Sequence, residues 1–535
     1  MFWADRIAAD ATAELQVVND SKTPSGRVHV GSVRGVVIHD TIYRALRRQG
    51  KAVKFLYGAD DYDAFDSIPS YLDRERFEPY LGMSLCNVPS PGEGASDYAK
   101  YFMGEFLEVL AGLGIEPEVY YLRDHYRAGK FDRHIDIFLQ NAQLVRDAYK
   151  DASKAERPDN WYPFQVVCEN CGKIATTAVT DYNGSEVYYE CKPEATDYTQ
   201  GCGHSGWRSP FGGNGKLPWK VEWVAKWDLW GVTIELAGKD HSQKGGSRDV
   251  ANAICRKVLR KQPPFHSPYE FILVNGTKMS SSKGVGSSAR DMSQLLPPEI
   301  LRFLMLRTRP KSAINFMPNY ETIVRLFRDY DGLVEQYMEA MQANAIPSDT
   351  SGEFPEDLLS LLYSQLDESV RTYHPFDFST VVSLLQIPHL DIRQEIATRS
   401  TLAPDESDRA ENERRIAVAQ KWLDDYADEE EKLVIYFDSI PDRAKALSEE
   451  QVNYLSKLVA NLDTATWEGE TLQTTIFTTT KEIDMKPGKA FPAVYLSFLN
   501  KERGPRAGAF LSYLDREFAI ARLQAVIAAN TDDDN

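Results

Sequence analysis

The stretch TPSGRVHVGS (residues 23–32) decides the fold that the sequence predicts. The residues before it, LQVVN (15–19), are typical of a buried strand, and apolar residues recur at helical spacing from Val30 to about Arg48. A second buried strand, AVKFLYG, is expected at 52–58. A strand, a loop, a helix and a strand in this order indicate the start of a parallel nucleotide-binding sheet.

The same loop is suited to bind phosphate. It precedes a helix whose first N–H groups and dipole favour an anion. We expect His29 to reach a phosphate oxygen and Gly31, which has no side chain, to let a flat base approach the backbone. Loops with proline, glycine and one histidine are common, so this motif alone is a weak indication.

A second motif, KMSSSKG (278–284), follows the expected strand FILVN (271–275). Its two lysines, three hydroxyls and glycine suit a loop that closes over a triphosphate and stabilises the charge developing on the α-phosphate and pyrophosphate. A flexible Ser/Lys linker is the alternative interpretation.

Four of the six cysteines crowd together, at Cys168, Cys171, Cys191 and Cys202. Thiolates at this spacing suit one tetrahedral, structural Zn²⁺ on a ribbon. The gap between Cys191 and Cys202 exceeds the usual two residues, and His204 is an alternative fourth ligand. Reduced free thiols are the alternative to a metal site.

The predicted fold class is α/β: a Rossmann-like parallel-sheet catalytic domain with a zinc-ribbon insertion, followed by an all-α C-terminal domain. The sheet pattern resumes after the insertion with VTIEL (232–236), and helical patterns dominate from about residue 297. The expected parts are the first half of the catalytic domain (1–159), the insertion (160–218), the second half with the KMSSSKG loop (219–296), a helical region (297–350) and an α-helical C-terminal domain (351–535).

The net charge of −18 argues against a nucleic-acid partner only when it is taken as a whole. Residues 351–535 carry −15, whereas residues 244–311 carry +9. Because the local field decides whether a polyanion docks, the basic segment around KMSSSKG can bind one, with chance clustering as the alternative. The start has no signal-peptide pattern and no apolar run could span a membrane, so we expect a cytoplasmic protein.

The two motifs together carry a resemblance. HVGS (29–32) resembles the HIGH motif of class I aminoacyl-tRNA synthetases, and KMSSS (278–282) resembles their KMSKS motif, in the right order and strand contexts. Ser32 replaces the second histidine of HIGH. Ser281 replaces the second lysine of KMSKS, for which Lys283 is a candidate substitute.

Over nearly its whole length the chain resembles the class I lysyl-tRNA synthetases of archaea and some bacteria. Further segments that carry this resemblance are ADDYDAF (59–65), KLPWKVEWVAKW (216–227), GKDHSQKGGS (238–247) and KERGPRAG (501–508). The glutamyl enzyme is the nearest competitor. It would need an arginine near its pocket, whereas a lysine pocket needs acceptors and aromatic walls.

The resemblance implies the site residues. Those expected to bind ATP are Pro24, Ser25, Gly26, His29, Gly31, Ser32, Asp240, Lys278, Met279 and Lys283. Those expected to act in catalysis are His29, Gly31, Ser32, Lys278, Ser280, Ser282 and Lys283. Those expected to bind lysine are Ser21, Thr23, Asp61, Trp219, His241 and Tyr269, although the family usually has glycine where Ser21 stands.

Several of these assignments have an ordinary alternative. One carboxylate among Asp60, Asp61 and Asp63 is expected to meet a lysine ammonium, and capping of a loop is the alternative for each. Asp240 could bind a ribose hydroxyl or the ammonium. For Trp219 and Tyr269 the alternative is core packing.

The implied reaction is ATP-dependent activation of L-lysine to lysyl-adenylate, followed by transfer to tRNA(Lys). ATP, Mg²⁺ bound with it and a structural Zn²⁺ are the expected cofactors, and we expect a monomer. The resemblance further implies that tRNA binds before efficient lysine activation. The insertion would contact the acceptor end, residues 297–350 the stem, and the C-terminal domain the anticodon, with Lys501, Arg503 and Arg506 as candidates.

Three alternatives remain open at this point. One is a glutamyl-type class I synthetase. Another is a synthetase-like paralogue that binds tRNA without catalysis. The last is a small-molecule nucleotidyltransferase, for which the helical C-terminal part and the zinc ribbon would be superfluous.

Overall fold

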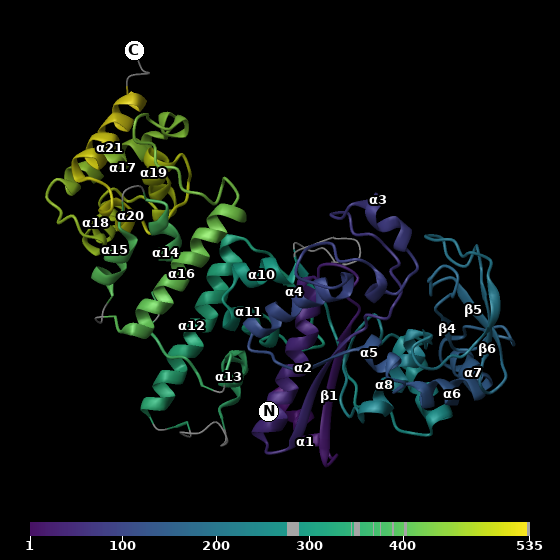
Figure 1. Cartoon of the computed structure of the whole chain (residues 1–535). Helices are drawn as coiled ribbons and strands as arrows, with labels where there is room; N and C mark the ends of the chain where they lie inside the picture. Colours follow the sequence, from purple (N-terminus) through teal and green to yellow (C-terminus); the bar gives the residue numbers. More distant parts are fainter. Residues whose placement is uncertain are drawn as a thin grey trace. The chain divides into compact units, whose positions relative to one another are not determined.

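A computed structural model of the chain describes residues 1–274, 288–343, 345–346, 354–367, 369–374, 376–387, 390–400 and 404–531. The chain forms two compact units. The first unit comprises Met1–Pro318 and Asp329–Arg371, and the second comprises Asn319–Arg328 and Thr372–Asn535. Figure 1 shows the strands in the first unit and a set of helices, α14 to α21, in the second.

The core of the first unit is a parallel sheet. Strand β1 (Leu15–Lys22) pairs in parallel with β2 (Ala52–Ala59), and β2 pairs in parallel with β3 (Glu118–Tyr121). Helix α2 (Val30–Arg48) connects β1 to β2 and packs beside them (Figure 1). The strand, loop, helix and strand expected around TPSGRVHVGS are therefore present. Both strands pair through to Lys22 and Ala59, which brings their carboxyl ends to one edge.

The sheet continues from β1 through short parallel pairings. Val18 bridges to Ile234, and Ile234 bridges to Phe265. Beyond them β9 (Ala237–Gly238) pairs with β10 (Pro268–Tyr269), and β11 (Ile272–Val274) pairs with β12 (Ile314–Phe316). Within the expected strand at 232–236, only Ile234 forms β-bridges. Regular strand pairing begins just after it, at Ala237.

Residues 132–153 form two helices rather than one. Helix α6 (Asp132–Gln140) ends at Asn141, and α7 (Ala142–Ser153) begins after it. The backbone of Asn141 leaves the helical region with φ −108° and ψ 31°, and its side-chain amide donates to the carbonyl of Ile137. The backbone N–H of Asn141 still donates to the carbonyl of Ile137 over 3.1 Å, so the break lies in the backbone dihedral angles and not in the loss of that bond.

The insertion is built from short antiparallel strands. Strand β4 (Gln165–Val166) pairs with β8 (Gly215–Lys216). Three further strands form a separate sheet, namely β5 (Thr177–Tyr182), β6 (Val187–Cys191) and β7 (Ser205–Arg208). Helices α6, α7 and α8 lie next to this part of the molecule in Figure 1.

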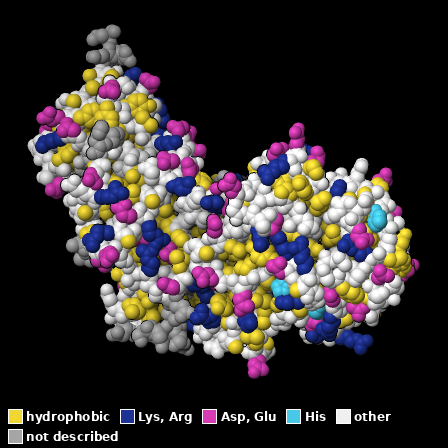
Figure 2. All heavy atoms as spheres, viewed as in Figure 1, with side chains coloured by type: hydrophobic (Ala, Val, Ile, Leu, Met, Phe, Trp, Pro, Cys, Tyr) yellow, Lys and Arg dark blue, Asp and Glu magenta, His cyan; other side chains and the backbone are white. Residues whose placement is uncertain are grey.

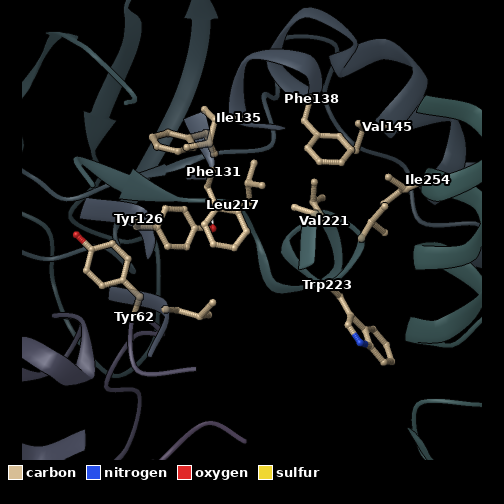
Figure 3. Close-up of a cluster of buried hydrophobic side chains, with 14 of the residues drawn as sticks. Tyr62, Tyr126, Phe131, Ile135, Phe138, Val145, Leu217, Val221, Trp223 and Ile254 are labelled. Carbon is tan, nitrogen blue, oxygen red and sulfur yellow. Dashed lines mark hydrogen bonds between the residues drawn. The ribbon is translucent and has the colours of Figure 1, made fainter. Parts of the chain in front are cut away.

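One hydrophobic cluster joins the insertion to the catalytic part. The rings of Tyr62 and Tyr126 stack at 5.4 Å, and those of Tyr126 and Phe131 stack at 4.4 Å. Leu217 and Val221 pack against the same cluster (Figure 3). Burial of these rings away from water fixes α8 (Trp219–Trp230) against the sheet, and α8 contributes four residues to the site described below.

The first unit contains further helices. They are α1 (Trp3–Asp10), α3 (Arg74–Phe77), α4 (Tyr98–Gly112), α5 (Leu122–Arg127), α9 (Ser247–Ile254), α10 (Ala289–Leu295), α11 (Pro298–Leu306) and α13 (Leu359–Ser364). Helix α12 (Tyr320–Gln342) begins in the second unit and continues in the first.

The described residues of the second unit form helices and loops, with no strand among them. Its helices are α14 (Phe378–Leu385), α15 (Ile392–Arg399), α16 (Glu406–Asp425), α17 (Glu449–Leu462), α18 (Gly469–Glu482), α19 (Pro487–Leu499), α20 (Ala507–Ser512) and α21 (Arg516–Thr531). A core that includes Tyr454, Leu458, Phe498 and Leu523 holds the last five helices together. The predicted fold class, a parallel-sheet domain with a cysteine-rich insertion and a helical C-terminal part, is confirmed. In the described part of the chain, no helix combines the length and apolar character needed to cross a membrane.

Candidate active site

A cavity of about 420 Å³ opens where β1 and β2 end. Ligands bind at this edge of parallel sheets because loops diverge from the strand ends there. The residues that line the cavity come from the end of β1 and its loop (Asp20–Thr23, Ser25), from α2 (Ser32), from β2 and its loop (Tyr57, Asp60, Asp63), from α8 (Trp219, Glu222, Trp223, Lys226) and from the later strands (Glu235–Gly238, His241, Tyr269).

The predicted phosphate loop reaches this cavity. His29 is the N-cap of α2, so the free N–H groups of the first helical turn start beside it. The hydroxyl of Tyr98 donates to the carbonyl of Ser25 over 2.9 Å, and the N–H of Ala289 donates to the carbonyl of Val28 over 2.8 Å. These bonds hold the loop on both sides. Ser25 and Ser32 line the cavity, while Pro24 and Gly26 are buried beneath the loop.

Asp60 lies in the cavity and is paired with a lysine of the protein itself. The Lys226 ammonium lies 2.9 Å from Oδ1 of Asp60 and 2.9 Å from Oγ of Ser21. The Ser21 hydroxyl in turn donates to Oδ2 of Asp60 over 3.1 Å. Burial by itself lowers the pKa of Lys226, but the neighbouring carboxylates, Asp60 first among them, outweigh burial and raise it. Lys226 therefore stays charged.

A second charged group stands beside the first. Lys216 contacts the carboxylate of Asp63 and lies 3.2 Å from Oε1 of Glu222. Thr23 donates to Asp63 over 2.7 Å, and Tyr126 donates to Glu222 over 2.6 Å. Burial opposes ionisation of Asp63, but Lys216 reverses this effect and lowers the pKa of Asp63 below its usual value. Burial raises the pKa of Glu222 to about 7.

Asp61, which the sequence analysis placed in the lysine pocket, is not among the residues that line the cavity. Its side chain is fully buried and its carboxylate is bound by the guanidinium and the backbone N–H of Arg123. Arg123 also binds Asp97 over 2.6 Å. Asp60 therefore lies in the cavity, whereas Asp61 forms a buried ion pair with Arg123.

Aromatic rings form one wall of the cavity. The Trp219 and His241 rings lie 5.5 Å apart, and the Trp223 and His241 rings lie 6.3 Å apart. Trp219 is 43% exposed, which is unusual for tryptophan. Asp240 precedes His241, and its carboxylate accepts from the His241 N–H over 3.2 Å. Tyr269 also lines the cavity and lies against Gly35 of α2.

The structure thus brings together most of the predicted lysine-site residues. Ser21, Thr23, Trp219, His241 and Tyr269 all line the one cavity, together with Ser25 and Ser32 of the phosphate loop. The predictions for Lys278, Met279, Ser280, Ser282 and Lys283 lie outside the described residues. Those five residues, with the roles assigned to them, remain predictions.

Sequence reasoning missed Lys226, Glu222 and Trp223 as site residues. A periodic signal could have found them, because Trp219, Glu222, Trp223 and Lys226 recur at spacings of three and four. Such spacing places them on one helix face. That face is unusual in combining tryptophans with a buried acid and a buried lysine.

The four clustered cysteines form a second candidate site, in the insertion. The Sγ atoms of Cys168 and Cys202 lie 3.6 Å apart, those of Cys171 and Cys191 lie 3.7 Å apart, and all four lie within 4.8 Å of one another. A tetrahedral zinc with Zn–S bonds of about 2.3 Å needs sulfurs roughly 3.8 Å apart, so the four thiols fit that ion. His204 is not part of this group.

The cysteine cluster is also joined to the catalytic part through backbone bonds. Ile174 and Ala175 both donate to the carbonyl of Gly82, over 2.7 and 3.1 Å, and Lys173 bridges to Met83. Further along the same loop, the N–H of Leu85 donates to the carbonyl of Asp63 over 2.9 Å. A short run of hydrogen bonds therefore connects the cysteine cluster to a residue that lines the cavity.

The fold and the cavity define the class of protein. A first crossover helix that begins at an amino-acid-sized cavity, on a parallel sheet interrupted by a cysteine-rich insertion, is the catalytic domain of a class I aminoacyl-tRNA synthetase.

Comparison with known proteins gives the family. Residues 1–351 match the family model described as tRNA synthetases class I (K), and residues 398–527 match an anticodon binding domain. A protein named lysine--tRNA ligase from Archaeoglobus fulgidus is 34% identical over 98% of this chain and 100% of its own length. Proteins of that name from Methanococcus maripaludis and Methanocaldococcus jannaschii are each 32% identical, over 98% of this chain and 99% of their own length. The chain belongs to the class I lysine-type tRNA synthetases, as its resemblance predicts.

Proposed function

We propose that the chain performs the reaction of its family, the ATP-dependent joining of L-lysine to tRNA(Lys). The observation that carries this proposal is the shared cavity, in which Ser25 and Ser32 of the phosphate loop meet an acidic and aromatic amino-acid site. Acceptors and aromatic walls suit a long aliphatic stem that ends in an ammonium group. Among the described residues that line the cavity there is no arginine to receive the carboxylate side chain of glutamate.

The reaction has two steps. A lysine carboxylate oxygen attacks the α-phosphorus of ATP, and the bond to pyrophosphate breaks, which leaves lysyl-adenylate. A ribose hydroxyl at the tRNA terminus then attacks the lysyl carbonyl carbon, and AMP leaves. No protein nucleophile is needed, because the protein positions the reactants and stabilises the developing charge.

The residues of the chain divide this work. The start of α2, with His29, Gly31 and Ser32, holds the ATP phosphates. Lys278 and Lys283 of the KMSSSKG loop close over the α-phosphate and the leaving pyrophosphate. Mg²⁺, bound through the phosphates, neutralises part of their charge when present. Trp219 and His241 confine the lysine stem.

The cysteine insertion and the helical unit serve tRNA in this proposal. Cys168, Cys171, Cys191 and Cys202 hold a structural Zn²⁺, and the insertion contacts the acceptor end. The helical unit reads the anticodon. On the face shown in Figure 2, its lysine and arginine side chains are interspersed with acidic ones. Binding must therefore rely on local basic groups, and it should weaken steeply with added salt.

One assay tests the proposal against its alternatives. ATP–pyrophosphate exchange is measured with each amino acid, with and without tRNA. Exchange that depends on lysine supports the proposal. Exchange that depends on glutamate would show that the amino-acid substrate is glutamate and not lysine. Absence of pyrophosphate exchange with every amino acid, even when tRNA is added, would favour a non-catalytic paralogue. Light scattering of the purified chain tests the predicted monomer, and fractionation of cells tests the predicted cytoplasmic location.

A further inference from the structure

Five carboxylates line the cavity: Asp20, Asp60, Asp63, Glu222 and Glu235. All but the first accept hydrogen bonds from side-chain donors of the protein. These donors include Lys226 for Asp60, Lys216 for both Asp63 and Glu222, and the indole N–H of Trp227 for Glu235. Four of the five negative groups are thus already engaged before any substrate binds.

Asp20 differs from the other four. Its carboxylate accepts one hydrogen bond, from the backbone N–H of Ser21 over 2.9 Å. The nearest imidazole nitrogen, Nδ1 of His39, lies 3.5 Å away and is bonded to the carbonyl of Gly35 over 2.8 Å. Nε2 of His39 accepts from the N–H of Leu236 over 2.9 Å, so the imidazole is neutral. His39 therefore offers Asp20 neither a proton nor a charge.

The other charged groups around Asp20 do not engage it directly. Lys22, Lys226 and Asp60 act on it electrostatically. Among the described residues, however, none donates a side-chain hydrogen bond to its carboxylate. Burial raises the pKa of Asp20 to about 7. A carboxylate that is desolvated and lacks a charged hydrogen-bond donor is unstable, and a bound cation would relieve this.

Asp20 lies beside the first turns of α2, whose start is the proposed phosphate-binding end of the cavity. A Cβ added to Gly35 of α2 would lie 3.5 Å from Oδ2 of Asp20 and 2.6 Å from the hydroxyl of Tyr269, so these two groups converge beside Gly35. Gly35 is about one turn along α2 from Ser32, which lines the same cavity near the phosphate-binding end. In lysine, the α-ammonium sits on the carbon next to the reacting carboxylate, whereas the ε-ammonium is four methylenes further away.

We propose that the carboxylate of Asp20 binds the α-ammonium group of the lysine substrate. The inference rests on the proposed lysine activation and extends it, since Asp20 becomes the residue that fixes the reacting end of the amino acid. The carboxylates on α8 and after β2 keep their own protein partners. Asp20 supplies the negative charge that remains for the substrate.

The test compares two lysine analogues as competitive inhibitors of lysine-dependent pyrophosphate exchange. Norleucine keeps the α-ammonium and lacks the ε-ammonium, and 6-aminohexanoate keeps the terminal ammonium and lacks the α-ammonium. In Asp20→Asn we expect the KM for lysine and the Ki for norleucine to rise about tenfold or more, because a charged hydrogen bond is lost. The Ki for 6-aminohexanoate should stay within about twofold, as expected when a probe does not contact the changed group.

The outcomes separate the inference from the proposed function. Absence of lysine-dependent exchange in the unaltered protein would overturn the function itself. An unchanged Ki for norleucine, or an equal rise for 6-aminohexanoate, would overturn only the role of Asp20. A Ki for 6-aminohexanoate that is the same in Asp20→Asn as in the unaltered protein also shows that the cavity of the variant is folded. Asp10→Asn, which removes the same charge from an exposed position on α1, is the matched control and should change neither constant.

Discussion

The ammonium group of Lys226 lies 2.9 Å from Oδ1 of Asp60, and both side chains are held inside the amino-acid cavity. The protein thus keeps a buried lysine of its own in the site proposed to receive lysine. The pair neutralises Asp60 without substrate, and the Ser21 hydroxyl completes it by bonding both partners.

Removal of Lys226 should destabilise the fold. In Lys226→Met the Asp60 carboxylate loses its counter-charge in a buried place, and we expect a loss of about 3 kcal/mol in the free energy of unfolding, measured with urea. The double variant Lys226→Met with Asp60→Asn should recover part of this loss. Lys54→Met, at an exposed position on β2, should change stability by less than about 0.5 kcal/mol. If Lys226→Met alone were as stable as Lys54→Met, that result would contradict a buried ion pair between Lys226 and Asp60.

The pKa of Asp20 predicts how stability changes with pH. Because its pKa is raised from 3.8 to about 7, the folded state holds this proton more tightly than the unfolded chain does. Stability contributed by the proton is therefore present below about pH 4 and is lost as pH rises toward 7. Asp20→Asn removes that loss, so it should raise Tm relative to the unaltered protein at pH 8 but not at pH 4. A Tm difference independent of pH would rule out this titration.

The cysteine cluster predicts the metal content. We expect about one zinc per chain, measured by elemental analysis, and release of zinc by a strong chelator. Cys202→Ser should lower the zinc content, because its sulfur lies 3.6 Å from that of Cys168. His204→Ala is the matched control and should keep the metal. Zinc loss in the histidine variant with retention in the cysteine variant would reverse the ligand assignment.

The KMSSSKG motif predicts a variant that changes kcat but not the KM for lysine. Lys278→Ala should lower kcat for lysine-dependent pyrophosphate exchange about 100-fold, because the ammonium acts on charge that develops in the transition state. The KM for lysine should change little. Lys311→Ala, an exposed lysine in the same basic segment, should have no comparable effect. Equal effects of Lys278→Ala on kcat and on lysine affinity would contradict a transition-state role.

Much of the fold could be predicted because its determinants are local. The strand, the loop and α2 follow from apolar periodicity near Val30, and the cysteine spacing predicts the thiol cluster. The break at Asn141 escaped prediction, because helical periodicity continues on both sides of it and only the backbone dihedral angles of that one residue depart from the helix.

The candidate site could be predicted only in part, for a different reason. Motif resemblance assigned Trp219 and His241 to the cavity that they do line. It could not separate Asp60 from its neighbour Asp61, because adjacent carboxylates look alike in a sequence and only the direction of the chain after β2 distinguishes them. Lys226 lies 166 residues from Asp60, and such a pairing is visible only after folding.

The backbone bonds between the cysteine cluster and Gly82 make the insertion a brace rather than a detachable module. Excising residues 160–218 would strip the Gly82 carbonyl of both its donors and would loosen the loop that leads to Asp63. Loss of zinc would act along the same route. Removal of zinc would then weaken the selection of the correct amino acid. This loss of specificity would occur at a lower degree of metal depletion than unfolding.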